Sequence, residues 1–192
     1  MEKRSGKERQ SDLTAHLTGI LLLDIDFFKR INDNYGHNAG DAVLIEVSQR
    51  LKSCCRDHDF IVRWGGEEIV LLLDTISISQ VRPFIQRILK AVAEPAIQFE
   101  QHLIDVSVSG GFIHLPFAKV SEQQLNWEKV MQIADMALYL SKTNGRNQVY
   151  LVNDLKVPYE QAESLLYSDL GRAIEQELVE ITIEYGPGGR VN

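Results

Sequence analysis

Two segments typical of β-strands, residues 59–64 and 69–73, are separated by Gly65-Gly66-Glu67-Glu68. So short a connection predicts an antiparallel hairpin. Adjacent glycines permit positive φ angles and let a bulky ligand approach the backbone closely. The two neighbouring carboxylates would repel each other unless a cation neutralised them. The hairpin is therefore either a solvated turn with incidental charge or half of a site for a hard divalent cation, which prefers carboxylate oxygens.

A second acidic segment follows an apolar run at residues 20–23 and precedes a short helical pattern. The run is typical of a strand buried on both faces. Asp26 is suitably placed to cap the helix. Asp24 has no such role, and an unpaired carboxylate at the end of an apolar strand is costly. We therefore predict that Asp24 and Glu67 share a magnesium site, with the Ile25 carbonyl as a further oxygen ligand.

Together these segments resemble the signature of the GGDEF family, the diguanylate cyclases, in a GGEEI variant that ends at Ile69. The resemblance extends over roughly residues 19–152 in the family's usual order. Its other segments are Asp24–Asp33, Tyr35–His37, Gly40-Asp41, Val106–Gly111, Ala134–Tyr139, Lys142 and Gly145–Asn147. The family's opening Asp-x-Leu-Thr-Gly-Leu segment is present only in fragments such as Leu17-Thr18-Gly19.

The resemblance implies condensation of two GTP molecules into cyclic di-GMP (c-di-GMP), with release of pyrophosphate. It implies two Mg²⁺ ions per active site, with Mn²⁺ as an alternative. The implied metal ligands are Asp24, Ile25 through its carbonyl, Glu67 and Glu68, and the three acids are also the expected catalytic residues. Glu68 could instead help to deprotonate the attacking hydroxyl. Since each domain would hold one GTP, a homodimer is expected.

The resemblance also implies a GTP site made of Phe27, Phe28, Asn32, Asp41, Gly65, Gly66, Lys142 and Arg146. Phe27 and Phe28 would bind phosphate through backbone amides at a helix start, with their rings packed in the core. Asn32 and Asp41 would read guanine, because a carboxylate accepts from an N1–H that adenine lacks. Asp41 is also a possible helix cap after Gly40.

Lys142 and Arg146 would contact the β- and γ-phosphates of GTP. Their four-residue spacing at the end of a predicted helix has a simpler explanation, interaction with the helix C-terminus. Beside the other motifs, phosphate binding is the interpretation we favour.

The segment from Arg56 to Asp59 matches the RxxD inhibitory site at which the family binds its own c-di-GMP. Arginine can pair with guanine O6 and N7 or with phosphate. The simpler interpretation is a surface ion pair. Arg87, on the next predicted helix, would be a second product-binding arginine.

Composition narrows the classes of function. The chain has 192 residues and a formal net charge of −7, which argues against general binding to nucleic acid. No apolar stretch has the length of a membrane span, and the N-terminus lacks a signal-peptide pattern. Cys54 and Cys55 are adjacent and cannot link distant segments, which favours a reducing cytoplasm.

The predicted elements suit an α/β (α+β) fold with a central, mostly antiparallel sheet flanked by helices. This ferredoxin-like arrangement is close to polymerase palms and agrees with the GGDEF fold. Helices are predicted at 41–55, 78–93, 127–143 and 159–176. We expect a polar N-terminal tail (1–18), the GGDEF domain (19–156) and a C-terminal helix and strand (157–192). The last part either packs on the core or opens an EAL phosphodiesterase domain, whose first helix it resembles.

Two other functions compete with the cyclase. One is a non-catalytic sensor that binds GTP or c-di-GMP and regulates a partner phosphodiesterase. The intact set of Asp24, Glu67 and Glu68 favours the enzyme over this sensor. The other is a cyclase of the adenylate type, against which Asn32 and Asp41 argue.

Overall fold

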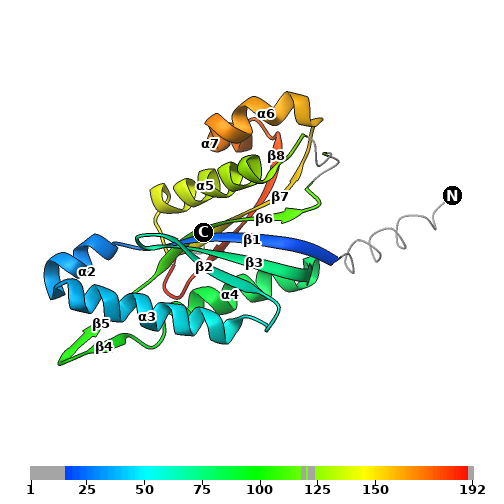
Figure 1. Ribbon diagram of the computed structural model, residues 1–192. Coiled ribbons are helices and arrows are strands. Elements are labelled where there is room, and N and C mark those ends of the chain that lie inside the picture. The colour runs from blue at the N-terminus through cyan, green and yellow to red at the C-terminus, as the bar shows by residue number, and fades with distance from the viewer. Residues whose placement is uncertain (1–15, 118–119, 121–123, 190–192) are drawn as a thin grey trace.

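The computed structural model describes residues 16–117, 120 and 124–189. At its centre is a six-stranded sheet with the order β2-β3-β1-β6-β7-β8 (Figure 1). Its strands are β1 (His16–Ile25), β2 (Phe60–Gly65), β3 (Glu68–Ser77), β6 (Val108–Leu115), β7 (Gln148–Leu155) and β8 (Val179–Tyr185). A separate hairpin contains β4 (Ile97–Phe99) and β5 (His102–Ile104). Among the described strands only β6 and β7 pair in parallel, so the mostly antiparallel α/β prediction is confirmed.

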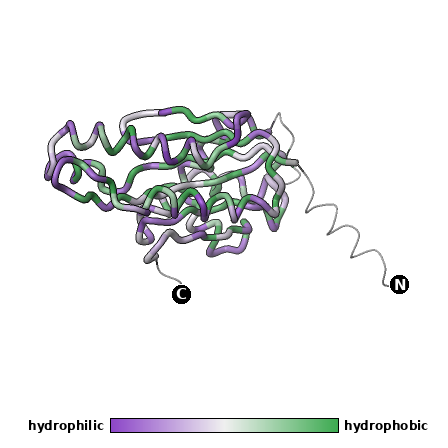
Figure 2. Tube along the Cα trace, turned by 90° about the horizontal axis from the view of Figure 1, so that it is seen from below, coloured by the Kyte–Doolittle hydropathy of each residue, from purple (hydrophilic) through white to green (hydrophobic). Residues whose placement is uncertain are grey.

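Helices cover both faces of the sheet (Figure 1). One layer contains α2 (Phe28–Tyr35), α3 (His37–Cys54) and α4 (Ile78–Ala93), and the other contains α5 (Trp127–Thr143), α6 (Tyr159–Ser168) and α7 (Leu170–Glu175). Strand β1 serves both cores because successive side chains point to opposite faces. Leu21 and Leu23 belong to the core under α3 and α4, whereas Ile20 and Leu22 belong to the core under α5. Apolar and polar positions alternate along the helices (Figure 2), as helices packed on one face require.

Two predicted helices differ from those observed: one begins earlier in the chain than expected, and the other is divided into two helices. The helix expected from Asp41 begins at His37, after Gly36 with φ 86°. Asp41 therefore lies inside α3, and its predicted role as a cap is wrong. The single helix expected over 159–176 is interrupted at Asp169, whose Oδ1 accepts from the Arg172 amide at 2.9 Å and caps α7.

The C-terminal segment packs on the core. Strand β8 pairs with β7 and forms the edge of the sheet. In β8, the buried Glu184 accepts hydrogen bonds from Arg82 and Gln86 of α4. On the other face, Lys129 Nζ lies 2.9 Å from Glu163 Oε1 and joins α5 to α6. The proposed start of an EAL domain here stays a prediction.

At the other end, β1 already begins at His16, inside the expected tail 1–18. Residues 1–15 of that tail lie outside the described residues. In the part of the chain that the structure describes, no helix has the length and hydrophobicity needed to cross a bilayer.

Candidate active site

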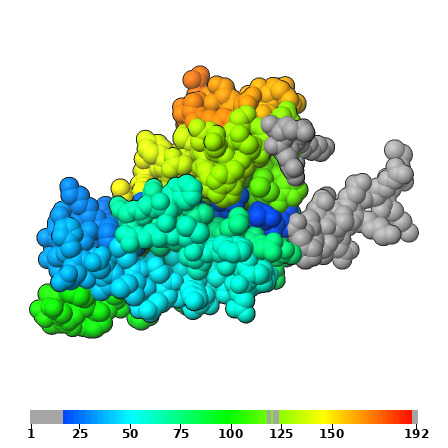
Figure 3. Space-filling model, viewed as in Figure 1, coloured from blue at the N-terminus to red at the C-terminus, as the bar shows by residue number. Residues whose placement is uncertain are grey.

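The acidic residues of the two predicted segments meet at the end of β1. Asp24 is the partner of Glu68 in the β1–β3 ladder, and the Ile25 amide donates to the Glu67 carbonyl at 3.3 Å. Burial raises the pKa of the Asp24 carboxyl, and the negative charges of Glu67 and Glu68 raise it further. The repulsion shows that the three carboxylates share one electrostatic environment. The space-filling view shows the β2–β3 hairpin at the surface between α2 and α5 (Figure 3).

Lys142 contacts the metal-ligand candidate Asp24. Its Nζ lies 2.7 Å from Asp24 Oδ2 and lowers the pKa of the carboxyl, against the larger effect of burial. Within the described ranges, no three His, Cys, Asp or Glu side chains are gathered as a metal site. The cation that neutralises Asp24 in this structure is therefore the lysine ammonium.

Asp26 does not cap α2, so that interpretation is wrong. Its buried carboxylate accepts from Ser107 Oγ at 2.7 Å, from Ser109 Oγ at 2.6 Å and from the Asn147 amide at 3.0 Å. These donors come from the residue before β6, from β6 itself and from the turn before β7. Asp26 thus fixes the loop after β1 to the turn after α5.

The two phenylalanines occupy different environments. Helix α2 begins at Phe28, whose ring packs partly buried against the core. Phe27 precedes the helix with φ 56°, and 50% of its surface is exposed. The prediction that both rings lie in the core is therefore wrong for Phe27. Its ring instead contacts the guanidinium groups of Arg30 and Arg146, with their Cζ atoms 4.8 and 4.4 Å from the ring centroid.

The two predicted guanine readers lie on α2 and α3, which pack together. A Cβ on Gly40 would come within 2.0 Å of Asn32 Oδ1, so only glycine leaves room for this side chain. Asn32 therefore lies against the residue that precedes Asp41. Asp41 itself is exposed.

The two glycines of the hairpin do not adopt the positive φ angles that glycine permits. Neither Gly65 nor Gly66 has a φ in the left-handed region, so this part of the prediction is wrong. A Cβ on Gly66 would meet no described atom within 4 Å. The surface beside Gly66 is therefore open, as the predicted close approach of a ligand to this backbone requires.

The three predicted product-binding residues line one pocket. Arg56, Asp59 and Arg87 surround a cavity of about 220 Å³ between the end of α3, β3 and α4. The backbone amide of Arg56 donates to Asp59 Oδ2 at 2.8 Å, and among the described residues no ion pair joins this carboxylate to the Arg56 guanidinium. The Arg56 guanidinium donates instead through Nη2 to Gln80 Oε1 at 3.2 Å. The sequence did not predict a site role for Gln80, because its partner Arg56 lies 24 residues away and no motif around Gln80 indicates this contact.

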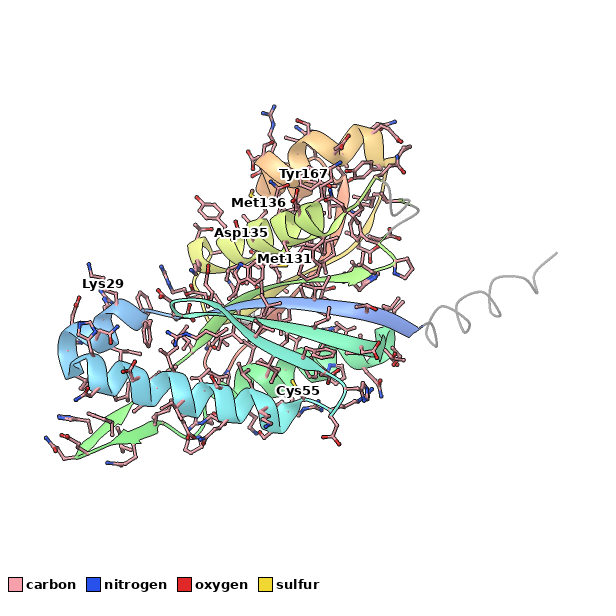
Figure 4. All side chains as sticks on the ribbon, in the orientation of Figure 1. Lys29, Cys55, Met131, Asp135, Met136 and Tyr167 are labelled. Carbon is pink, nitrogen blue, oxygen red and sulfur yellow. The ribbon has the colours of Figure 1, made fainter. Side chains whose placement is uncertain are left out.

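Cys55 follows the last residue of α3 (Figure 4) and is adjacent in sequence to Cys54, which lines this pocket. Burial, followed by the charges of Asp59 and Cys54, raises the pKa of its thiol to about 12, against the opposing effect of Arg87. Both cysteines are free. A protonated thiol is a poor nucleophile, so Cys55 contributes packing rather than chemistry.

The family model "Diguanylate cyclase, GGDEF domain" matches residues 1–148. The chain belongs to the GGDEF diguanylate cyclase family. This GGDEF chain is 45% identical over 132 residues to Diguanylate cyclase A of Treponema denticola, which covers 69% of this chain and 34% of that protein. It is 32% identical over 168 residues to the bifunctional diguanylate cyclase/cyclic di-GMP phosphodiesterase MucR of Pseudomonas aeruginosa, with 88% and 23% covered. The chain thus spans about a third or less of the length of these curated relatives.

Solved structures agree with the assignment. The active GGEEF domain of a diguanylate cyclase from Vibrio cholerae has a TM-score of 0.59 at 30% identity, with 74% of this chain and 86% of that one covered. The GGDEF domain of DgcB from Caulobacter crescentus, in complex with c-di-GMP, has a TM-score of 0.60 at 28% identity, with 73% and 86% covered. The GGDEF fold and the membership in the cyclase family predicted from the sequence are both confirmed.

Proposed function

We propose that this chain condenses two GTP molecules into c-di-GMP and pyrophosphate. The observation that carries the proposal is that the β1–β3 ladder pairs Asp24 with Glu68, while the Ile25 amide bonds to the Glu67 carbonyl, so the three acids come together at the end of β1. Placing three acids beside an open glycine turn provides the fold with the Asp24–Lys142 ion pair but also with repulsion between the carboxylates. They suit a reaction in which phosphate charge must be neutralised.

The donor set fits a hard divalent ion. Asp24, Glu67 and Glu68 offer carboxylate oxygens, and Ile25 offers its carbonyl. Magnesium commonly takes only one or two carboxylates from the protein, since phosphates and water complete its octahedron. Such ions, two per site and either Mg²⁺ or Mn²⁺, would supply neutralisation of the phosphate charge. Glu68 is either a ligand or the base that receives the proton of the attacking hydroxyl.

The cationic residues would hold the triphosphate. Lys142 has a carboxylate partner in Asp24, and an entering phosphate offers a second one of higher charge. We propose that Lys142 moves to the phosphate and thereby releases the Asp24 carboxylate. Arg146 lies on the same side, 4.0 Å from Asp26. The first two amides of α2, at Phe28 and Lys29, precede the first amide bonded within this turn (Arg30 to the Phe27 carbonyl) and can also donate to phosphate.

Base recognition is assigned to Asn32 and Asp41. Asp41 is exposed at the surface of α3 and would accept from the N1–H and amine of guanine. Adenine would leave this carboxylate facing an acceptor, which costs binding energy. The 3′-hydroxyl of each GTP would then attack the α-phosphorus of the GTP held by the other copy, so that two phosphodiester bonds form and two pyrophosphates leave. Catalysis therefore requires a homodimer.

The pocket lined by Arg56, Asp59 and Arg87 would bind the product. Among the described residues, no carboxylate is paired with the Arg56 guanidinium, which can pair bidentately with guanine or phosphate. Product bound there would restrain the domain and lower the rate. This site is separate from the acidic one at the end of β1.

Incubation with GTP and MgCl₂, followed by chromatography, tests the proposal. We expect c-di-GMP and pyrophosphate from the natural chain and none from Glu67→Gln. Glu94→Gln, an exposed glutamate after α4, is the matched control and should retain activity. Turnover per molecule should rise with protein concentration because two copies react. GTP binding with no product at any concentration would instead support the regulatory sensor.

A further inference from the structure

Phe27 and Arg146 face each other from two left-handed turns. Phe27 has φ 56° at the end of the loop after β1, and Arg146 has φ 64° in the turn after α5. Positive φ is unfavourable for a bulky side chain. Both turns are held by Asp26, which precedes Phe27 and accepts from the Asn147 amide. The fold therefore maintains two strained positions that bring one ring and one guanidinium together.

The ring of Phe27 is bounded by two cations. The Cζ of Arg146 lies 4.4 Å from the ring centroid, and that of Arg30, in the first turn of α2, lies 4.8 Å from it. Both distances are within the range of cation–π attraction. The ring is half exposed, although a phenylalanine gains stability by burial. Its position is thus explained by the arginines rather than by the hydrophobic core.

The contact of the Arg146 guanidinium with the Phe27 ring does not use the N–H donors of the guanidinium. Among the described residues, no hydrogen bond to another protein group occupies the side chain of Arg146, and its Nε is 4.0 Å from Asp26 Oδ1. A guanidinium fixed through its face keeps its N–H donors available for an oxyanion. Within the described residues, an entering phosphate therefore competes only with the 4.0 Å ion pair between Arg146 and Asp26.

We infer that Phe27 is a positioning residue that orders the Arg146 guanidinium for a phosphate group, with Arg30 completing the stack on the ring. This inference rests on the proposed function, in which Arg146 binds the triphosphate. It assigns the Phe27 side chain a role separate from that of its backbone amide. Arg30, which the sequence analysis left without a role, enters the site through the same ring.

The test measures binding of two probes, inorganic triphosphate and guanosine, to the natural chain and to Phe27→Leu by calorimetry. Leucine keeps the backbone amide and the apolar bulk but removes the ring. We expect triphosphate binding to weaken about three- to thirty-fold, the range of one cation–π contact, with guanosine binding unchanged. Phe27→Tyr should restore it. Phe60→Leu, an exposed phenylalanine of β2, is the matched control.

A double-mutant cycle separates positioning from a general loss of structure. If Phe27 acts through Arg146, the combination of Phe27→Leu with Arg146→Met weakens triphosphate binding no more than Arg146→Met alone. Additive losses, or equal weakening of guanosine and triphosphate, would overturn the inference. So would unchanged triphosphate binding in Phe27→Leu. A natural chain that binds triphosphate but makes no c-di-GMP would refute the proposed reaction and leave this comparison intact.

Discussion

Lys142 Nζ lies 2.7 Å from Asp24 Oδ2, so the residue expected at the phosphates contacts the residue expected at the metal. Asp24 is nearly buried, and its carboxylate also experiences Glu67 and Glu68. The lysine is the one influence in this group that favours the ionised form. The protonation of Asp24 therefore depends on whether Lys142 stays in contact with its carboxylate.

Replacing Lys142 with Met should raise the pKa of Asp24 still further. The lysine lowers that pKa by hydrogen bond and charge, so its loss leaves burial and the two glutamates unopposed. We expect the acid limb of the kcat/KM profile, which reports the free enzyme, to move to higher pH, and kcat/KM to fall by about tenfold or more, typical of a lost charged contact. Lys52→Met, on the exposed face of α3, is the control. An unmoved acid limb would contradict the prediction.

Asp24→Asn should abolish activity and increase stability. The pKa of Asp24 is raised in the folded chain, so its stabilising contribution is complete below the unfolded pKa and is lost as the pH rises through the folded pKa. At neutral pH the charge therefore destabilises the fold. We expect the free energy of unfolding to rise by about 0.5–2 kcal/mol at pH 7, the range of typical stabilising changes, and the gain to vanish at low pH. Urea titrations at both pH values measure this, and equal gains at both would exclude the mechanism.

Ser109→Ala should destabilise the fold more than Ser107→Ala. Both hydroxyls donate to Asp26, but Ser109 is fully buried whereas Ser107 is partly exposed. Water can replace the bond lost at Ser107, while at Ser109 a buried carboxylate oxygen loses its donor. The expected cost is about 1–3 kcal/mol for Ser109→Ala and roughly 1 kcal/mol or less for Ser107→Ala. Urea unfolding compares the pair directly, and equal costs would contradict the assigned difference.

Arg56→Ala should relieve inhibition by c-di-GMP while leaving the initial rate unchanged. Arg56 lines the pocket proposed to bind the product, and this pocket is separate from the acidic site. Loss of a bidentate contact should weaken c-di-GMP binding by about tenfold or more. Initial rates with added c-di-GMP measure the effect. Arg172→Ala, an exposed position of α7, is the control, and inhibition that persists in Arg56→Ala would remove the pocket from consideration.

The sequence predicted those features that have local causes. The bounds of α4 and α5 follow from apolar residues at helical spacing, and the meeting of Asp24 with the hairpin follows from two matched motifs. The role of Asp26 could not be predicted. Its partners are 81 to 121 residues away, so a nearby helix start was the only visible explanation for it. The contact of the exposed Phe27 ring with Arg146 was missed for the same reason, because the two residues are distant in sequence.

Gly186→Ala should destabilise the chain, whereas Gly171→Ala should not. A Cβ on Gly186, just after β8, would come within 2.0 Å of Asn147 Oδ1, and the Gly186 amide donates to the Asn147 carbonyl at 2.8 Å. In α7, a Cβ on Gly171 would make ordinary contacts at 3.5 Å. We expect a loss of about 1–3 kcal/mol for the first change and a gain of up to about 1 kcal/mol for the second.

The same pair of variants links the C-terminal segment to the active site. Asn147 also donates its amide to Asp26, so a displaced Asn147 should disturb the turn that carries Arg146. Gly186→Ala should therefore raise the KM for GTP, measured below the unfolding transition, while Gly171→Ala leaves it unchanged. Thermal unfolding separates the change in stability from the change in KM. A destabilised Gly186→Ala chain with the natural KM would mean that β8 supports the sheet without influencing the nucleotide site.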